Sequence, residues 1–190
     1  MTLFVQTVKR LTNRNSILAE VALIMTGSIL IAASAQIRFY LPNTPVPVTL
    51  QTLTVLLIAA VLGSWRGVAA VVTYIAAGSL GLPFFAGLKG GPITLLGPTG
   101  GYLLGFVVAA GLVGWMAKRK VYYNLLSAIP MFLAGQVVIY VFGTIWLSQF
   151  VGSISQALTV GVLPFIPGDI IKVVVGILIL PTTWRIFRNQ

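Results

Sequence analysis

The chain has 190 residues, of which 58 % are hydrophobic and 7 % are charged, and its mean hydropathy is +1.03. Soluble domains carry about 25 % charged residues, so this composition excludes an ordinary soluble domain and predicts an integral membrane protein. Cysteine and histidine are both absent from the sequence. Their absence excludes disulfides, thiolate metal sites and any catalytic mechanism that uses either side chain.

Apolar runs divide the chain into segments of helical length. A membrane-spanning helix takes about 20 apolar residues, so this chain accommodates roughly six spans and leaves no room for a separate soluble domain. We therefore expect a single membrane domain over residues 1–190, with an all-α fold of six transmembrane helices. The predicted spans are residues 17–37, 49–62, 67–80, 102–117, 125–147 and 167–184.

The net charge of +10 comes from basic residues that lie between the apolar runs. Nucleic-acid binding needs a clustered basic surface, so no nucleic-acid partner is expected. Cytoplasmic connections are richer in Lys and Arg than external ones, which predicts that both termini are cytoplasmic. In that orientation Arg38 and Lys89 lie outside and Lys172 lies in a span. The nine inside are Lys9, Arg10, Arg14, Arg66, Lys118, Arg119, Lys120, Arg185 and Arg188.

Two loops rich in proline or glycine are predicted on the outer side. Residues 38–48 contain three prolines, which cannot continue a helix, and residues 81–101 contain seven glycines and three prolines. A connection as long as the second usually has a function. Residues 148–166 are interpreted as an interfacial segment. The topology places both loops beside the start of the sixth helix, where together they can build one site.

The acidic residues are confined to Glu20 and Asp169. Asp169 precedes Lys172 by three positions, so the two share a helix face and can pair. Pro167 fits the first helical turn, which places Asp169 where the helix dipole favours negative charge. Ionisable groups in a span indicate a functional site by default. The alternative is a structural ion pair.

The stretch Gly97-Pro98-Thr99-Gly100-Gly101 stands directly before a predicted helix. Its backbone N–H groups could approach a ligand; the alternative is a tight turn between spans. It lacks the Gly-Lys-Ser/Thr end of a P-loop, so the chain is not expected to hydrolyse ATP by itself. Four aromatic residues could wall a pocket or belong to the membrane interface: Phe84, Phe85, Tyr102 and Tyr140.

Polar side chains inside the spans are expected to face inward, because an amide that faces lipid is unfavourable. This applies to Gln36, Gln51 and Gln136, although each could serve only an interhelical hydrogen bond. Glu20 could be a proton-coupling carboxylate. From its shallow depth we expect a solvated residue at the end of its span instead.

Several short fragments, in their order and spacing, resemble the BioY family, the biotin-specific S components of energy-coupling-factor (ECF) transporters. The resemblance covers residues 32 to about 176. Its fragments are Ala35-Gln36-Ile37, Leu41-Pro42, Thr44-Pro45-Val46-Pro47-Val48-Thr49-Leu50-Gln51-Thr52, Tyr74, Gly78, Gly81-Leu82-Pro83, Gly97-Pro98-Thr99-Gly100-Gly101-Tyr102-Leu103, Gly105-Phe106, Phe165-Ile166-Pro167-Gly168-Asp169 and Lys172.

The resemblance implies a biotin pocket near the outer surface of a prokaryotic cell (inner) membrane, closed by the loops after the first and third helices. Asp169 and Lys172 match the family's ligand-binding pair. The implied partners are biotin, membrane lipid, a coupling protein and two ATPase subunits, with no catalysis and no cofactor. The other expected substrate-binding residues are Gln51, Phe84, Phe85, Lys89, Thr99, Gly100, Tyr102 and Gln136.

The sequence departs from the family pattern in three respects. Lys89 replaces an expected arginine, so a point charge replaces a bidentate donor. Gln136 replaces an asparagine, which keeps the amide and moves it outward. The first helix lacks the strict Ala-x-x-x-Ala with which such proteins dock on the coupling protein. Small-residue faces remain at Ala22 to Thr26 and at Ser28 to Ala32.

The expected function is therefore that of the biotin-binding substrate-capture subunit of an ECF-type vitamin uptake transporter, energised by its partners. The alternative is an autonomous proton- or ion-coupled carrier that uses Asp169 or Glu20. An intramembrane aspartyl protease would need two catalytic aspartates and the chain has one, so an enzyme is not expected. The sequence leaves open which charge meets which end of the ligand.

Overall fold

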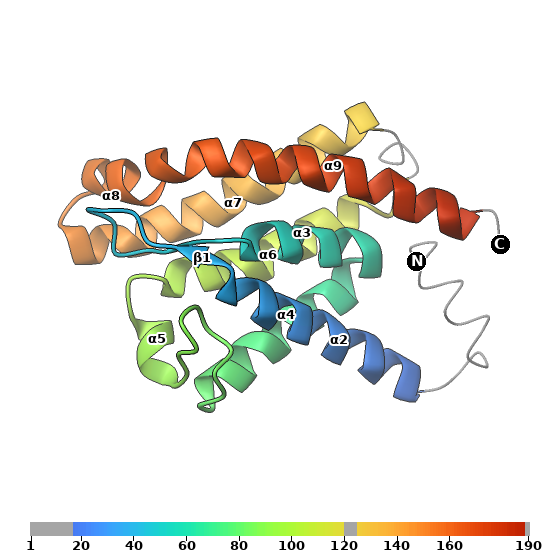
Figure 1. Cartoon of the computed structure of the whole chain (residues 1–190), viewed down its shortest axis with the longest axis horizontal. Coiled ribbons are helices and arrows are strands. Elements are labelled where there is room, and N and C mark those ends of the chain that lie inside the picture. Colours follow the sequence, from blue (N-terminus) through green and yellow to red (C-terminus); the bar gives the residue numbers. More distant parts are fainter. Residues whose placement is uncertain (1–16, 120–124, 189–190) are drawn as a thin grey trace.

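The computed structural model describes residues 17–119 and 125–188, and this part of the chain is mainly helical (Figure 1). Its long helices coincide with the six predicted apolar runs, which confirms that these runs are helical. They are α2 (Ile17–Gln36), α3 (Gln51–Leu62), α4 (Ser64–Ser79), α6 (Gly100–Met116), α7 (Leu125–Val151) and α9 (Ile166–Arg188). Four of the basic residues used to predict the orientation lie outside the described residues: Lys9, Arg10, Arg14 and Lys120. For two more, Arg185 and Arg188, only the backbone is described.

Hydropathy supports a membrane location for the bundle. Three described segments are long and apolar enough to cross a membrane: Ile17–Gln36, Ala128–Val151 and Ile154–Leu180. Two shorter apolar helices, α3 and α6, accompany them. The 12 residues of α3 give a length of about 18 Å, less than the roughly 30 Å hydrocarbon core. Only Gly63, with φ of 84°, separates α3 from α4.

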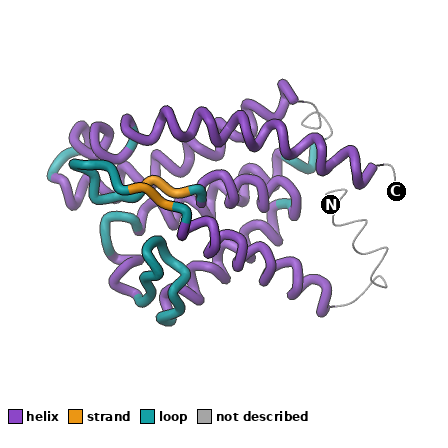
Figure 2. The backbone as a smooth tube through the Cα atoms, viewed as in Figure 1, coloured by secondary structure: helices purple, strands orange, loops and turns teal. Residues whose placement is uncertain are grey.

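The short elements gather at one end of the bundle, on the left of Figure 1, and Figure 2 shows most of the loop segments there too. Strands β1 (Arg38–Phe39) and β2 (Val48–Thr49) pair antiparallel with Arg38 opposite Thr49. The second loop, predicted without regular structure, contains helix α5 (Pro92–Leu96). The segment interpreted as interfacial continues α7 to Val151 and then forms α8 (Ile154–Gly161) and the 3-10 helix η2 (Leu163–Phe165).

The bundle packs around α6, which lies against α7, α4 and α3, while α2 covers α4 and α9 covers α7 and α3. Small residues mark the interfaces: Gly67 of α4 faces Ala59, and Gly105 of α6 faces Ile139. Membrane helices associate largely through van der Waals packing, which small side chains favour. Large apolar side chains cover the outside, as on α2, where the exposed ones include Val21, Met25, Ile29 and Leu30.

Glu20 is not the solvated residue that its position suggested. Arg66 donates to both of its carboxylate oxygens, with Nε 2.5 Å from Oε2 and Nη2 2.7 Å from Oε1. Arg66 itself lies within α4 and is only 9 % exposed. A bidentate guanidinium–carboxylate pair is strong and geometrically specific. It therefore ties α2 to α4 and lets the two charges neutralise each other at a largely buried position.

Close packing at the α3–α4 turn gives the first prediction. A Cβ added at Gly114 of α6 would lie 2.6 Å from the carbonyl carbon of Gly63, whereas one added at Gly111 meets only Val68, at 3.6 Å. Gly114→Ala should lower the stability of the detergent-solubilised protein by about 1 to 3 kcal/mol through overpacking. Gly111→Ala is the matched control and should leave it unchanged or higher, because alanine is the better helix former. Equal melting temperatures for the two variants would contradict this packing.

Candidate ligand-binding site

A cavity of about 370 Å³ lies where the loops meet the helix ends. Its wall comes from the β1–β2 loop, the loop between α4 and α6, and helices α3, α4, α6, α7 and α9. The lining residues are Tyr40, Pro45, Val46, Pro47, Thr49, Gln51, Thr52, Tyr74, Phe85, Ala86, Lys89, Ile93, Thr94, Gly97, Pro98, Thr99, Tyr102, Leu103, Phe106, Gln136, Ile139, Tyr140, Phe165, Asp169 and Lys172.

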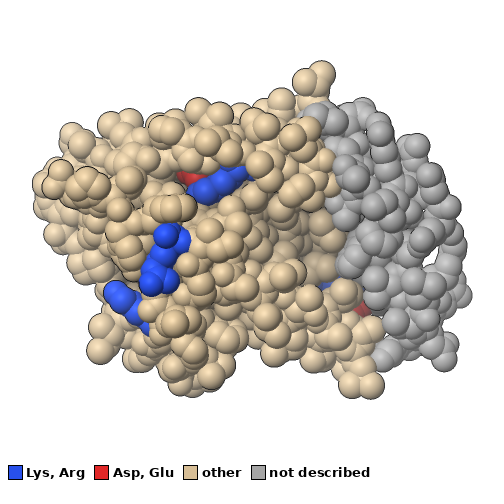
Figure 3. All heavy atoms as spheres, in the orientation of Figure 1, with Lys and Arg blue, Asp and Glu red and all other residues tan. Residues whose placement is uncertain are grey.

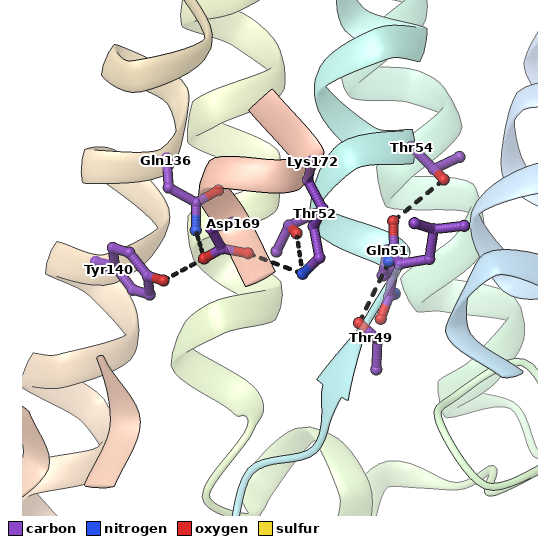
Figure 4. A network of polar contacts seen from close by, with 9 residues as sticks. Thr49, Gln51, Thr52, Thr54, Gln136, Tyr140, Asp169 and Lys172 are labelled. Carbon is purple, nitrogen blue, oxygen red and sulfur yellow. Dashed lines mark hydrogen bonds and ion pairs between the residues drawn. The ribbon is translucent and has the colours of Figure 1, made fainter. Parts of the chain in front are cut away.

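Asp169 is the centre of a polar cluster in this wall (Figure 4). Its carboxylate is buried, at 5 % exposure. Its Oδ2 accepts from Gln136 Nε2 at 2.6 Å and from the hydroxyl of Tyr140. Its Oδ1 accepts from Lys172 Nζ at 2.8 Å. The predicted pairing of Asp169 with Lys172 is thus confirmed, and α7 adds two further donors to the carboxylate.

Lys172 joins this cluster to α3. Its Nζ also donates to Thr52 Oγ1 at 3.1 Å. Asp169 lies in the first turn of α9, where the helix dipole stabilises a negative charge, and Lys172 follows one turn later on the same face. Because the ammonium and the carboxylate neutralise each other, the cluster as a whole carries hydrogen-bonding groups with little net charge.

The cluster keeps spare hydrogen-bonding capacity. A carboxylate has about four acceptor positions and an ammonium has three donors. Hydrogen bonds from Gln136, Tyr140 and Lys172 occupy three of the acceptor positions of Asp169. Bonds to Asp169 and Thr52 occupy two of the donors of Lys172. Nearby, the buried Nε2 of Gln51 has no hydrogen-bond partner among the described residues. A neutral ligand group with an N–H beside a carbonyl would use this capacity.

Phe85 closes the apolar part of the cavity. Its buried ring meets Tyr74 edge to face, with ring centroids 5.6 Å apart, and lies so close to Gly78 that no side chain fits between them. The Phe85 N–H donates to the carbonyl of Lys89 at 3.0 Å, which brings Lys89 onto the same short loop. Lys89 is exposed at the cavity edge. The loop therefore combines an apolar cover with a cation at the mouth.

The structure brings eight of the ten predicted substrate-binding residues to the cavity wall and leaves two away from it. Phe84 is not part of the wall; its ring stacks on Tyr74, with centroids 6.4 Å apart. Gly100 packs against Leu95 and Trp146 instead. The eight are Gln51, Phe85, Lys89, Thr99, Tyr102, Gln136, Asp169 and Lys172.

The sequence predicted no site role for Thr52 and Tyr74, although both stand in the fragments that carry the family resemblance. Thr52 bonds Lys172, and Tyr74 supports Phe85. The available signal for Thr52 was a second polar residue beside Gln51 in the first turn of an apolar helix. Tyr74 gave no such signal, because an aromatic residue within a span is common in any helical core.

The two small-residue faces proposed for docking differ in the structure. Ala22 and Thr26 are exposed on α2. Ser28 and Ala32 are buried, at 0 % and 7 % exposure, so they face the bundle and not a partner. Figure 3 shows a largely uncharged surface with a few separated charged patches. Among the described residues no group of His, Cys, Asp and Glu could hold a metal ion.

A helical membrane bundle with a mainly apolar cavity that carries one nearly neutral polar cluster defines a protein that captures a small, partly apolar ligand. Comparison with known proteins identifies the family. The BioY family model matches residues 6–189, and the chain belongs to this family.

Relatives and a solved structure agree with this assignment. The chain is 45 % identical over 139 residues to the biotin transporter BioY of Thermotoga maritima, covering 73 % of this chain and 81 % of the relative. It is 40 % identical over 148 residues to that of Rhodobacter capsulatus, covering 72 % and 78 %. The fold is similar to the crystal structure of the S-component for biotin from an ECF-type ABC transporter, with a TM-score of 0.81, 26 % identity, and coverage of 91 % of this chain and 92 % of that one.

Paired replacement of Asp169 and Lys172 separates a ligand site from a structural ion pair. Asp169→Asn or Lys172→Gln alone strands a buried charge and should cost about 3 to 5 kcal/mol of stability, seen as a lower melting temperature. The double variant should recover most of this stability. Each single variant also loses a charged hydrogen bond to ligand, about 1.5 to 3 kcal/mol, and so at least about tenfold in affinity.

The measurement is calorimetric titration with biotin, the ligand named for the relatives, beside thermal unfolding of the three variants. The double variant should fold and bind weakly. Wild-type affinity in the double variant would contradict this assignment. The site would then lie among Gln51, Lys89 and Tyr102.

Proposed function

We propose that this chain is the biotin-capture subunit of an ECF-type vitamin uptake transporter and works without catalysis or a cofactor. The observation that carries the proposal is the Asp169–Lys172 cluster, which offers one acceptor and one donor side by side in the cavity wall. Family membership and relatives named as biotin transporters support biotin as the ligand. The cavity volume of about 370 Å³ lies at the small end of the range for ligand pockets.

The chemistry of biotin suggests how it is oriented. Its ureido ring presents N–H groups beside a carbonyl, which match the free acceptor position of Asp169 and the remaining donor of Lys172. The amide of Gln51 supplies a second donor for that carbonyl. A carboxylate placed against Asp169 would be repelled. The carboxylate tail therefore points to the mouth, toward the exposed Lys89, and the thioether ring lies against Phe85.

We infer that the six long helices all cross a prokaryotic cell (inner) membrane within one domain, with both termini in the cytoplasm. The nine-to-two distribution of basic residues supports this orientation. Three segments have the length and hydropathy of spans. The shorter helices α3 and α4 would each cross, as two successive spans joined by a turn at Gly63. Near this turn Glu20 and Arg66 neutralise each other.

The proposed partners are a coupling membrane protein and two ATPase subunits, because the sequence carries no P-loop. The exposed small residues Ala22 and Thr26 of α2 form the proposed docking face, since small side chains allow close helix approach. An autonomous carrier that uses Glu20 or Asp169 is not favoured. Glu20 is bonded to Arg66 and Asp169 to three donors, and the relatives point to an S component.

Purified protein should bind biotin with one ligand per chain, because one Asp–Lys cluster lies in one cavity. Isothermal titration calorimetry measures this stoichiometry. Saturation with a different vitamin and not with biotin would keep the architecture and overturn the ligand assignment. No heat or saturation with biotin at any accessible concentration would overturn the proposal.

Bulky substitution at Ala22 and Thr26, to tryptophan, should abolish uptake of labelled biotin while leaving biotin affinity unchanged, because neither residue lines the cavity. Val21→Trp is the matched control, since Val21 is 49 % exposed on an adjacent face of α2. Uptake in cells with the partner subunits and affinity in detergent are measured for each variant. Lost affinity together with normal assembly would reverse the assignment of this face.

A further inference from the structure

The loop that carries Phe85 and Lys89 is folded upon itself. The N–H of Gly91 donates to the carbonyl of Gly78 at 2.7 Å, which closes the loop at its base, and the Phe85–Lys89 bridge closes it again near its tip. Leu88 has φ of 57°, a region that side-chain-bearing residues rarely adopt without support. We call residues 84–89 the lid segment. It keeps its own shape and needs an attachment to the bundle to stay over the cavity.

Gln36, at the end of α2, provides that attachment. Its Nε2 donates to the carbonyls of Phe84 and Phe85, at 3.3 and 3.2 Å, and its Oε1 accepts from the N–H of Leu88 at 3.0 Å. The same Nε2 also contacts the carbonyl of Ala32 at 3.1 Å, which orients the side chain on its own helix. A side-chain amide offers donors and an acceptor together, so one glutamine bonds both the carbonyl groups and an N–H group of the lid backbone.

Gln36 is not in the cavity wall, and neither is any other residue of α2. Any effect of Gln36 on a ligand must therefore act through the lid segment, on which Phe85 and Lys89 line the cavity. The rest of the lid support is packing: Phe85 sits against Tyr74 and Gly78, and a Cβ at Gly87 would lie 3.3 Å from the Tyr40 hydroxyl.

We propose that Gln36 is a positioning residue that latches the lid segment over the cavity, so that its amide bonds set how long a bound ligand stays. The proposal rests on the proposed function for the identity of that ligand, biotin. Ligand exit requires the lid to move away from the mouth, and the three amide contacts must break before it can do so. The latch also joins the lid directly to α2, the helix that carries the proposed docking face.

Amide hydrogen exchange tests the latch without any ligand. Gln36→Met keeps the side-chain length and removes every polar contact, so the exchange of the Leu88 N–H should accelerate about tenfold or more, equivalent to about 1.4 kcal/mol. Gln36→Glu keeps an oxygen that accepts from the Leu88 N–H. It removes the N–H donor to the carbonyls of Phe84 and Phe85 and places a carboxylate oxygen there, which those carbonyls repel. The Leu88 N–H should then stay better protected than in Gln36→Met, while release of the lid carbonyls still loosens the rest of the segment.

Ser34→Ala is the matched control on α2. The Ser34 hydroxyl bonds only the carbonyl of Ile31 in its own helix among the contacts described, so this variant should leave lid exchange unchanged. If Gln36 had only a structural role, Gln36→Met would instead accelerate amide exchange throughout α2 and α4 and would lower the melting temperature. That outcome overturns the latch, and unchanged Leu88 exchange in Gln36→Met overturns it too.

Release of labelled biotin, chased with excess unlabelled biotin, is the second measurement. Gln36→Met should release biotin about tenfold faster than wild type, with a smaller change in the association rate, and Ser34→Ala should release it at the wild-type rate. Accelerated lid exchange with an unchanged release rate would overturn the claim that the latch sets ligand residence. If wild-type protein retains no biotin, the proposed function fails, and the exchange measurement still decides the latch. If Gln36→Met does not fold, Gln36→Glu decides both measurements.

Discussion

The burial of one carboxylate constrains the rest of this structure. Asp169 is almost completely enclosed, and an uncompensated charge in such surroundings would cost several kcal/mol. Compensation comes from Lys172 on its own helix and from Gln136 and Tyr140 on α7, while Thr52 of α3 holds Lys172. The first turns of α9 and α3 and the middle of α7 must therefore converge on one point. Because the shell leaves hydrogen-bonding positions unfilled, the same arrangement that stabilises the charge also prepares a site for a ligand.

Convergence at Asp169 explains the contrast between the two ends of the molecule. At the α3–α4 turn, Gly114 lets the backbone of α6 contact the backbone of Gly63 and Ser64. The Glu20–Arg66 ion pair joins α2 to α4 beside this turn. At the other end, proline, glycine and short helices cap the cavity without filling it. A rigid bundle thus supports a small set of loop contacts, of which the Gln36 amide and the Phe85 ring are the most directly attached. The helices thus carry the polar cluster of the site, and the loops cover it.

Features that depend on local sequence were predictable, and those that depend on distant pairing were not. Run length and breaker residues located the helices, and the three-residue spacing located the Asp169–Lys172 pair. Tyr140 and Gln136 lie 29 and 33 positions from Asp169, and Glu20 lies 46 from Arg66, so no local pattern joins them. The inward face of α2 was equally hidden, because its apolar residues surround the helix. Ser28 and Ala32 were therefore assigned to a docking face although they are buried.

A structure of the protein with biotin bound tests the central claim most directly. We expect the ureido ring within hydrogen-bonding distance of Asp169 and Lys172, with the carboxylate at the mouth beside Lys89 and the lid segment held by Gln36. Biotin bound outside this cavity, or with its carboxylate against the Asp169–Lys172 cluster, would contradict it.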